Sequence, residues 1–427
     1  MNDLLKRALL WLCGTSFIAG LATTGWVVYS NRSLPPIRVG LLHSLTGTMA
    51  ISELPVVDAT LLAIEQINQR GGLLGRQIEV VSADGQSDDA EFARQAERLI
   101  TEKKVHVVFG GWTSASRKSM KPVFEKHKHL LMYPIQYEGL EESQHIVYAG
   151  ATPNQQVIPA ISWAFQHLGK RFFLVGSDYI YPRTTAAIVK DLVATLGGQV
   201  VGEHYLPLGT TRVQQAVQEI LAAKPTVIIN TINGDTNLSF FRQLRSAGIS
   251  PEKIPTLSFS LSEPELHQLG AKNMAGDYAA WNYFQSLTSR ANQIFLSQLA
   301  QQHDDEKLVV GDPMESAYSA VFLWAQSVQR SGTVNVAKIH KAIRGQSYEA
   351  PHGVVHVDHQ NGHTWKTVRI GKIQKNGQFN VVWSSQSPVQ PIPYPPSRTK
   401  QQWQQFLHNL QKQWQGKWSG PTFTEER

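Results

Sequence analysis

The stretch FGGWTSASRKSMKPVFEKHKHLLMYP, residues 109–134, decides the fold. It begins at the end of an apolar strand, passes through a turn of small and hydroxyl residues, continues as a helix and ends in a second apolar strand. The turn residues Thr113, Ser114 and Ser116 are of the types that cap the N-terminus of a helix. A strand, a helix and a strand in this order form the repeating unit of a parallel α/β sheet.

The same alternation extends on both sides of this stretch. Upstream, apolar strands alternate with segments whose apolar residues recur at helical spacing, and the pattern repeats downstream of Asn154 as far as residue 248. The upstream segments are residues 37–43, 57–69, 76–84 and 88–102. The alternation predicts a parallel sheet flanked by helices, and its repetition predicts two similar α/β halves.

Aromatic and hydroxyl residues gather where the predicted strands end. The strand at residues 129–134 ends in Tyr133, and the strand at residues 172–182 ends in Tyr179 and Tyr181. The carboxyl ends of parallel strands line the ligand crevice of an open α/β sheet. These residues therefore predict an aromatic-walled, hydroxyl-rich pocket for a small uncharged polar molecule.

The last third of the chain departs from this rhythm. Three helix-like segments between residues 289 and 345 are followed by apolar runs between residues 353 and 383, which are joined at Asn361-Gly362 and Asn376-Gly377. Asn-Gly pairs favour tight hairpin turns, so these runs predict antiparallel strands. Composition alone places this part in a third small domain.

Several motifs carry a family resemblance. HSLTGTMAISE (residues 43–53), GSDYIYP (176–182) and NTINGDTN (230–237) resemble motifs of the type I periplasmic binding proteins of the urea and short-chain amide branch. The resemblance covers residues 37–395. The strings WTSASRK, NTINGD, DPMESAY and KTVRIG are more similar to urea-transport substrate-binding proteins than to amide-sensing regulators.

The resemblance implies an α/β fold of the type I periplasmic-binding-protein class, with two Rossmann-like lobes around a central cleft and three crossovers between them. It assigns the helices of the last third to the first lobe and the closing strands to the second lobe. The expected divisions are an N-terminal signal or anchor segment at residues 1–34, a first lobe at 35–153 plus about 282–350, a second lobe at 154–281 plus about 351–387, and a proline-rich linker with an amphipathic tail at 388–427.

The resemblance also implies pocket residues. Trp112, Ser114, Tyr133 and Tyr179 match positions that form the pocket in this branch, with the rings as walls and the hydroxyls as hydrogen-bond partners. Trp112 stands where the amide regulators have tyrosine, and Ile135 stands where they have threonine. Both differences argue for a ligand other than the amide that those regulators bind.

Further ligand-binding candidates come from turns and helix starts. Ser44 lies in the first strand-to-helix turn with Glu53 at its end, Asp235 follows an apolar strand, and Glu263 begins a helix. Carboxylates at these positions can accept hydrogen bonds from an amide NH2 group. Turns and helix starts favour the same residue types for structural reasons, so both roles stay open.

No catalytic residue, cofactor or metal site is expected. Ser114 has no GxSxG elbow around it, and the chain contains no P-loop, GxGxxG or HExxH motif. The four histidines of the closing strands resemble a metal site, but strand geometry and the turn at residues 361–362 separate them. They are His352, His356, His359 and His363.

Composition and the N-terminus define the class and the compartment. Hydrophobic content of 42% and charged content of 17% are typical of a globular protein. The net charge of +7 comes from scattered Lys and Arg, so nucleic-acid binding is not expected. Lys6 and Arg7 precede an uncharged apolar run at residues 8–30 that is long enough to span a bilayer. An uncleaved anchor is favoured over a removed signal peptide, and either one exports the remainder.

The C-terminal tail predicts an amphipathic helix. After a proline-rich segment, large apolar residues recur at helical spacing. They are Trp403, Phe406, Leu407, Leu410 and Trp414. A helix folded back on the body is expected, and contact with a membrane surface or a partner protein is the alternative.

The function expected from these features is that of an extracytoplasmic solute-binding protein in the periplasm, attached to the cytoplasmic membrane by its N-terminal segment. Its lobes would close on urea or a very small amide and deliver it to an ABC-type permease. The alternative is a membrane-anchored amide or urea sensor that signals through a partner. An extracytoplasmic amidase requires an activated nucleophile, which the sequence does not show.

Overall fold

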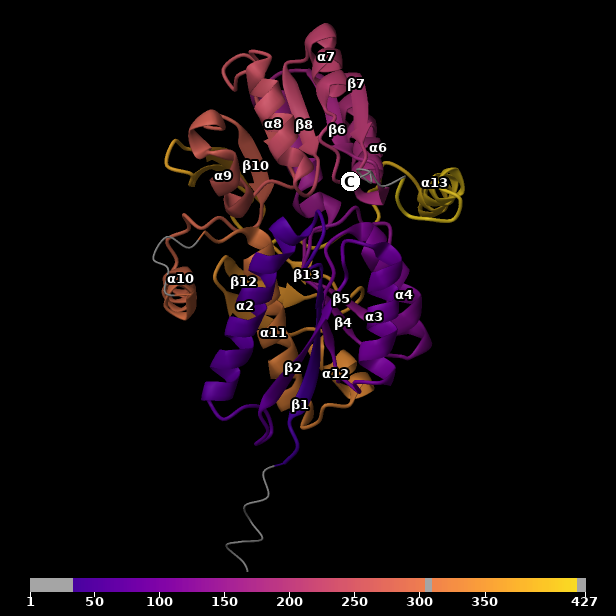
Figure 1. Cartoon of the computed structure of the whole chain (residues 1–427), viewed down its shortest axis with the longest axis vertical. Helices are drawn as coiled ribbons and strands as arrows, with labels where there is room; N and C mark the ends of the chain where they lie inside the picture. The colour runs from indigo at the N-terminus through magenta and orange to yellow at the C-terminus, as the bar shows by residue number, and fades with distance from the viewer. Residues whose placement is uncertain (1–33, 304–308, 421–427) are drawn as a thin grey trace, which may run out of the picture.

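The computed structural model describes residues 34–303 and 309–420, which form the two predicted α/β lobes. The first lobe is the lower one in Figure 1, and the second lobe lies above it. The predicted membrane anchor lies outside the described residues. In the part of the chain that the structure describes, no helix is both long enough and apolar enough to cross a membrane.

The first lobe contains a parallel five-stranded sheet in the order β2-β1-β3-β4-β5. Its strands are β1 (Ile37–His43), β2 (Ile78–Asp84), β3 (Val108–Gly110), β4 (Leu131–Tyr133) and β5 (Ile146–Tyr148). Gly110 has φ +151°, and a Cβ atom there would lie 1.9 Å from the Leu42 carbonyl oxygen. Glycine therefore permits the close approach of β1 and β3, whose carboxyl ends carry the turns beside the second lobe.

The second lobe contains a seven-stranded sheet in the order β15-β14-β10-β9-β8-β6-β7. Its strands are β6 (Arg171–Ser177), β7 (Gln199–Leu206), β8 (Val227–Thr231), β9 (Thr256–Ser258), β10 (Tyr278–Trp281), β14 (Arg369–Ile373) and β15 (Phe379–Ser384). Strands β6 to β10 pair in parallel, whereas β14 pairs antiparallel with both β10 and β15. Apolar clusters built from this sheet and its helices form the core of the lobe.

Helices flank both sheets. Those of the first lobe are α2 (Ala50–Gln69), α3 (Asp89–Thr101), α4 (Ser114–Lys126), α10 (Arg290–His303), α11 (Asp312–Ser331) and α12 (Val336–Ile343). Those of the second lobe are α5 (Val157–His167), α6 (Ile180–Thr195), α7 (Gln214–Ala223), α8 (Thr236–Ser246) and α9 (Glu263–Leu269). Helix α11 packs against α2, so the helices of the last third complete the first lobe rather than form a third domain.

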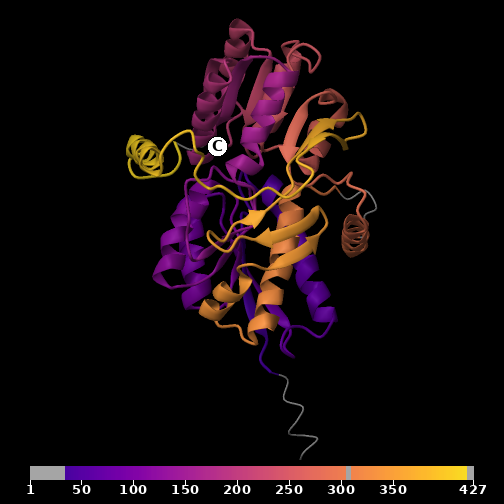
Figure 2. The same cartoon turned by 180° about the vertical axis from the view of Figure 1, so that it is seen from behind.

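The closing strands divide between the lobes. Strands β11 (Ser347–Ala350), β12 (Gly353–Val357) and β13 (Thr364–Trp365) form a small sheet of their own, and β11 packs against α11. Figure 2 shows these strands over the first lobe, before the chain rises into the second lobe. We expected this crossing near residue 351, but it is β14, from Arg369, that joins the larger sheet.

The three crossing segments meet at the side chain of Asn282. Its Nδ2 atom donates to the carbonyl oxygen of Gln155 at 3.1 Å, on the first crossing, and to that of Thr367 at 3.0 Å, on the third. Asn282 itself lies directly after β10, on the second crossing. Its backbone N–H and that of Tyr283 donate to Oδ2 of Asp312 at the start of α11. One buried amide and one buried carboxylate therefore fix the hinge.

The tail helix α13 (Lys400–Gln413) folds back against α6 of the second lobe. Trp403 is fully buried, and its Nε1 atom donates to the Pro395 carbonyl oxygen at 2.9 Å. The Arg398 guanidinium pairs through two nitrogens with Asp191 of α6, at 2.7 and 2.8 Å. This packing fixes the direction in which the chain leaves α13.

The first prediction concerns the hinge. In the Asn282→Ala variant, the Gln155 and Thr367 carbonyl groups lose their buried donor, so we expect the free energy of unfolding to fall by about 1–3 kcal/mol. Guanidinium chloride denaturation measures it. The exposed Asn409→Ala on α13 is the control and should change stability by less than about 0.5 kcal/mol. Equal stability of the Asn282→Ala variant and the wild type would show that the hinge does not depend on this side chain.

Candidate functional site

A cavity of about 730 Å³ lies between the two lobes. The first lobe contributes the turns after β1, β2 and β3, and the second lobe contributes the turns after β6 and β7. The segment that follows α13 forms a further wall. The lining residues that the argument below uses are Ser44, Glu53, Thr113, Ala115, Asp178 and Tyr179.

The turn after β1 places a buried carboxylate in the cavity wall. Oε2 of Glu53 accepts the backbone N–H of Ser44 at 2.9 Å and lies 3.0 Å from Nδ1 of His43. The Ser44 hydroxyl oxygen in turn accepts the backbone N–H of Ser87 at 3.1 Å. Oε1 of Glu53 has no hydrogen-bond partner among the described residues. The wall thus offers an unused, desolvated acceptor.

The start of α4 forms the neighbouring wall. Thr113 is the N-cap, and its hydroxyl oxygen accepts the Ser116 backbone N–H at 3.0 Å. Thr113 and Ala115 both line the cavity. The first N–H groups of a helix have no acceptor within the helix, and the helix dipole adds positive potential there. This wall therefore favours an oxygen atom of a ligand.

The second-lobe wall is built on the turn between β6 and α6. Tyr179 is the N-cap residue of α6 and is 4% exposed. Burial is the main cause that raises the pKa of its phenol, so the hydroxyl stays protonated. Asp178 beside it pairs with Arg183 at 2.8 Å. Tyr179 thus supplies an aromatic face and an O–H group.

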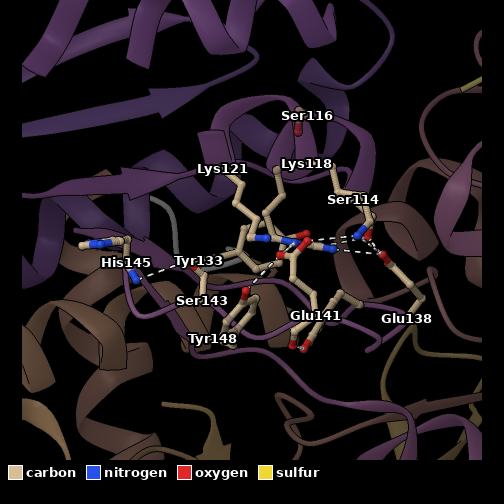
Figure 3. A network of polar contacts seen from close by, with 12 residues as sticks. Ser114, Ser116, Lys118, Lys121, Tyr133, Glu138, Glu141, Ser143, His145 and Tyr148 are labelled. Carbon is tan, nitrogen blue, oxygen red and sulfur yellow. Dashed lines mark hydrogen bonds and ion pairs between the residues drawn. The ribbon is translucent and has the colours of Figure 1, made fainter. Parts of the chain in front are cut away.

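A buried network of charged side chains lies between α4 and the loop after β4 (Figure 3). Arg117 is fully buried and donates to Glu141 at 3.0 Å, to Glu138 at 2.9 Å and to the Ser114 hydroxyl at 3.0 Å. Lys118 donates to Glu141 at 2.9 Å. Burial alone would raise the pKa of Glu141, but the charges of Lys118 and Arg117 lower it well below its usual value. The network anchors the loop after β4 to α4.

The hydroxyl groups of two residues that the sequence analysis assigned to the pocket already have hydrogen-bond partners. The Ser114 hydroxyl donates to Glu138, and the Tyr133 hydroxyl donates to the Trp112 carbonyl oxygen at 2.5 Å. Tyr133 is fully buried, with the Arg117 guanidinium 5.0 Å from its ring centroid. The described residues that line the cavity do not include Trp112, Ser114 or Tyr133. The hydroxyl groups of Ser114 and Tyr133 are thus already hydrogen-bonded within the first lobe.

Two other predicted residues lie at contacts between the lobes. Nε1 of Trp112 donates to Oδ1 of Asn233 at 3.4 Å, so the indole bridges the cleft. Asp235 is exposed and accepts a hydrogen bond from the Thr48 hydroxyl of the first lobe. The Ser52 hydroxyl likewise donates to Glu265 at 2.9 Å. The two lobes are therefore in contact across the cleft.

Glu263 lies at the hinge rather than in the cavity wall. It is fully buried, and its Oε1 atom accepts the Gln285 backbone N–H at 2.7 Å. Oε2 has no partner among the described residues. Burial raises the pKa of this carboxyl to about 8, and the nearby Asp312 and Glu265 act in the same direction.

The histidines of the closing strands do not form a common site. Nδ1 of His352 lies 2.6 Å from Glu315, and Nε2 of His363 lies 2.5 Å from the Tyr137 hydroxyl. Burial lowers the pKa of His363 to about 3. Across residues 34–303 and 309–420, no three His, Cys, Asp or Glu side chains are placed so as to hold a metal ion.

A family model described as a periplasmic binding protein domain matches residues 37–400. The chain belongs to this family. It is thus a periplasmic solute-binding protein and not an enzyme, and the family acts outside the cytoplasm. The urea and amide branch is a finer assignment that this match does not address.

Curated relatives agree with this assignment. The Leu/Ile/Val-binding protein homolog 6 of Brucella melitensis is 21% identical over 356 residues, which cover 79% of this chain and 88% of that one. A shorter match, 30% identical over 131 residues, is to a protein named limonene hydroxylase from Geobacillus stearothermophilus. It covers 31% of this chain and only 23% of that protein, so no hydroxylase activity follows from it.

Solved structures share the fold. A solute-binding protein of Rhodopseudomonas palustris HaA2 in complex with p-hydroxybenzoic acid has a TM-score of 0.76 at 22% identity, covering 83% of this chain and 98% of that one. A branched-chain amino acid binding protein of Streptococcus pneumoniae in complex with isoleucine has a TM-score of 0.72 at 21% identity, covering 83% and 100%. The predicted fold class is confirmed.

The second prediction concerns Glu263. The unfolded carboxyl ionises near pH 4.5, but the folded carboxyl stays protonated to about pH 8, so the wild type loses stability as the pH rises between these values. Glu263→Gln is neutral throughout and should not show this loss. We expect its melting temperature relative to the wild type to increase from pH 5 to about pH 8 and to level off above that pH.

The exposed Glu349→Gln is the matched control and should follow the wild type at every pH. Parallel stability profiles for Glu263→Gln and the wild type would contradict a raised pKa at this position.

Proposed function

We propose that this protein captures urea or a very small amide in the cavity between its lobes and delivers it to an ABC-type permease. The unpaired Oε1 atom of Glu53 is the observation on which the proposal depends. A buried carboxylate oxygen without a donor is costly, and a ligand NH2 group supplies the missing donor.

The charges around the cavity support an N–H donor over an anion. Four carboxylates line it, and of the two lysines, Lys118 is already paired with Glu141. The carboxylates are Glu53, Asp88, Asp89 and Asp178. A benzoate-like ligand would meet an excess of negative charge, whereas urea and small amides are uncharged. Amino acids carry an ammonium group that suits Glu53, and they form the competing class.

The walls match the groups of urea. Urea has two NH2 groups and one carbonyl, so it needs several acceptors and at least one donor. Glu53 and the Ser44 hydroxyl oxygen supply acceptors, and the start of α4 with the Tyr179 hydroxyl supplies donors. Trp112, Ser114 and Tyr133 support this wall from behind. In this proposal Asp235 acts through lobe closure, and Glu263 acts through the hinge.

The cavity volume determines which ligands the binding test must include. A cavity of about 730 Å³ is within the range of sites for larger ligands, so urea would share it with ordered water. A ligand panel must therefore include longer amides as well as amino acids and aromatic acids.

The third prediction is the corresponding binding measurement. Calorimetric titration of the purified protein should detect binding of urea or of formamide, and weaker or no binding of benzoate and leucine. Glu53→Gln should weaken binding roughly tenfold to hundredfold, because its amide group replaces one acceptor by a donor.

Glu79→Gln on β2, whose side chain is 43% exposed, is the control and should bind as the wild type does. Tight binding of benzoate or leucine with no binding of any amide would overturn the proposal. Full affinity of Glu53→Gln, with an unchanged melting temperature, would show that this carboxylate is not a ligand acceptor.

A further inference from the structure

The segment that follows α13, residues 414–420, runs along the mouth of the cavity between the lobes. It lines the cavity together with the turns of both lobes. The sequence analysis placed the tail helix on the body but assigned no role to the residues after it. These residues contact both lobes.

Backbone bonds fasten the segment to the second lobe. The Ile180 N–H donates to the Trp418 carbonyl oxygen at 3.0 Å, and the Gly420 N–H donates to the Asp178 carbonyl oxygen at 2.8 Å. Ser419 thereby pairs antiparallel with Tyr179, the residue that forms the second-lobe wall. Trp414, at the start of the segment, is 6% exposed and belongs to the apolar cluster of this lobe.

In the described part of the chain, side-chain contacts connect the segment to the first lobe. The Ser419 hydroxyl donates to Oδ2 of Asp89 at the start of α3, at 3.2 Å. The Lys118 ammonium of α4 lies 4.9 Å from the centroid of the Trp418 ring. Burial raises the pKa of Asp89 to about 6, in keeping with its cover by the segment. The two attachments therefore differ in kind: among the described residues, backbone pairing joins the segment to the second lobe, and side-chain contacts join it to the first.

We propose that residues 414–420 form a clasp that moves with the second lobe, completes the cavity wall on closure and retains the ligand by gripping Asp89 and Lys118. When the lobes part, the backbone pairing to residues 178–180 persists and only the Ser419 and Trp418 contacts break. The clasp therefore slows ligand release rather than preventing it.

The test compares two shortened chains. One ends at Gln415, which keeps α13 and Trp414 but removes residues 416–420 of the clasp. Its matched control ends at Gly420, which keeps the whole clasp. Hydrogen exchange in the ligand-free protein should be faster at the Ile180 amide in the first chain, because that amide loses its acceptor. The control chain should exchange as the full-length protein does.

The release-rate measurement rests on the proposed function. Stopped-flow dissociation of urea should be roughly tenfold faster from the chain that ends at Gln415 than from the control, because two contacts to the first lobe are lost. Trp418→Ala should raise the dissociation rate by about half as much on a logarithmic scale, which is about threefold. Trp418→Phe keeps an aromatic ring for Lys118, so its dissociation rate should stay close to that of the wild type.

The outcomes separate the two proposals. Unchanged exchange at Ile180 together with unchanged release would overturn the clasp while leaving the proposed function intact. If urea binds none of these proteins, the proposed function fails, and the exchange comparison still decides whether the segment occupies this position. Melting temperatures of all variants show whether any change comes from unfolding.

Discussion

The whole arrangement depends on the hydrogen bonds of one buried amide. The side chain of Asn282 joins the first and third crossings, and its own backbone is part of the second, so the three connections between the lobes converge on a single residue. Asp312 fixes the same point to the first lobe through two backbone N–H groups. Each lobe has its own core, but the geometry of the cleft is defined only because these segments are held together.

Away from the hinge, the two lobes touch through few polar contacts. Thr48 contacts Asp235, Ser52 contacts Glu265, and Trp112 contacts Asn233. The first of these hydrogen bonds is exposed and the other two join buried side chains. A hydrogen bond contributes about 0.5–1.5 kcal/mol of net free energy, so three of them hold the lobes together only weakly. A ligand that contacts both walls then decides how much of the population is closed. The acceptor on Glu53 and the ring of Tyr179 face the cavity from opposite lobes, as this requires.

The sequence predicted the fold well, and it named some of the residues that line the cavity. Alternating strands and helices, with residues such as Thr113 at helix starts, indicate the lobes because these signals are local. Ser44 and Tyr179 line the cavity, whereas Ser114 and Tyr133 do not. The fully buried Arg117 donates to Ser114 and lies over the ring of Tyr133, and the spacing of residues in the sequence does not reveal these contacts. Residues 414–420 are fastened to the second lobe by backbone hydrogen bonds, which leave no signal in the residue types.

The attachment of the hinge to α11 has a mechanical consequence. Asp312 begins this 20-residue helix, which extends about 30 Å into the first lobe. A rotation of about 10° at Asp312 therefore displaces the far end of the helix by roughly 5 Å relative to the second lobe. Under the proposed function, the helix would act as a lever arm, so that a small adjustment around a solute in the cleft would produce a much larger displacement at the far end of the first lobe.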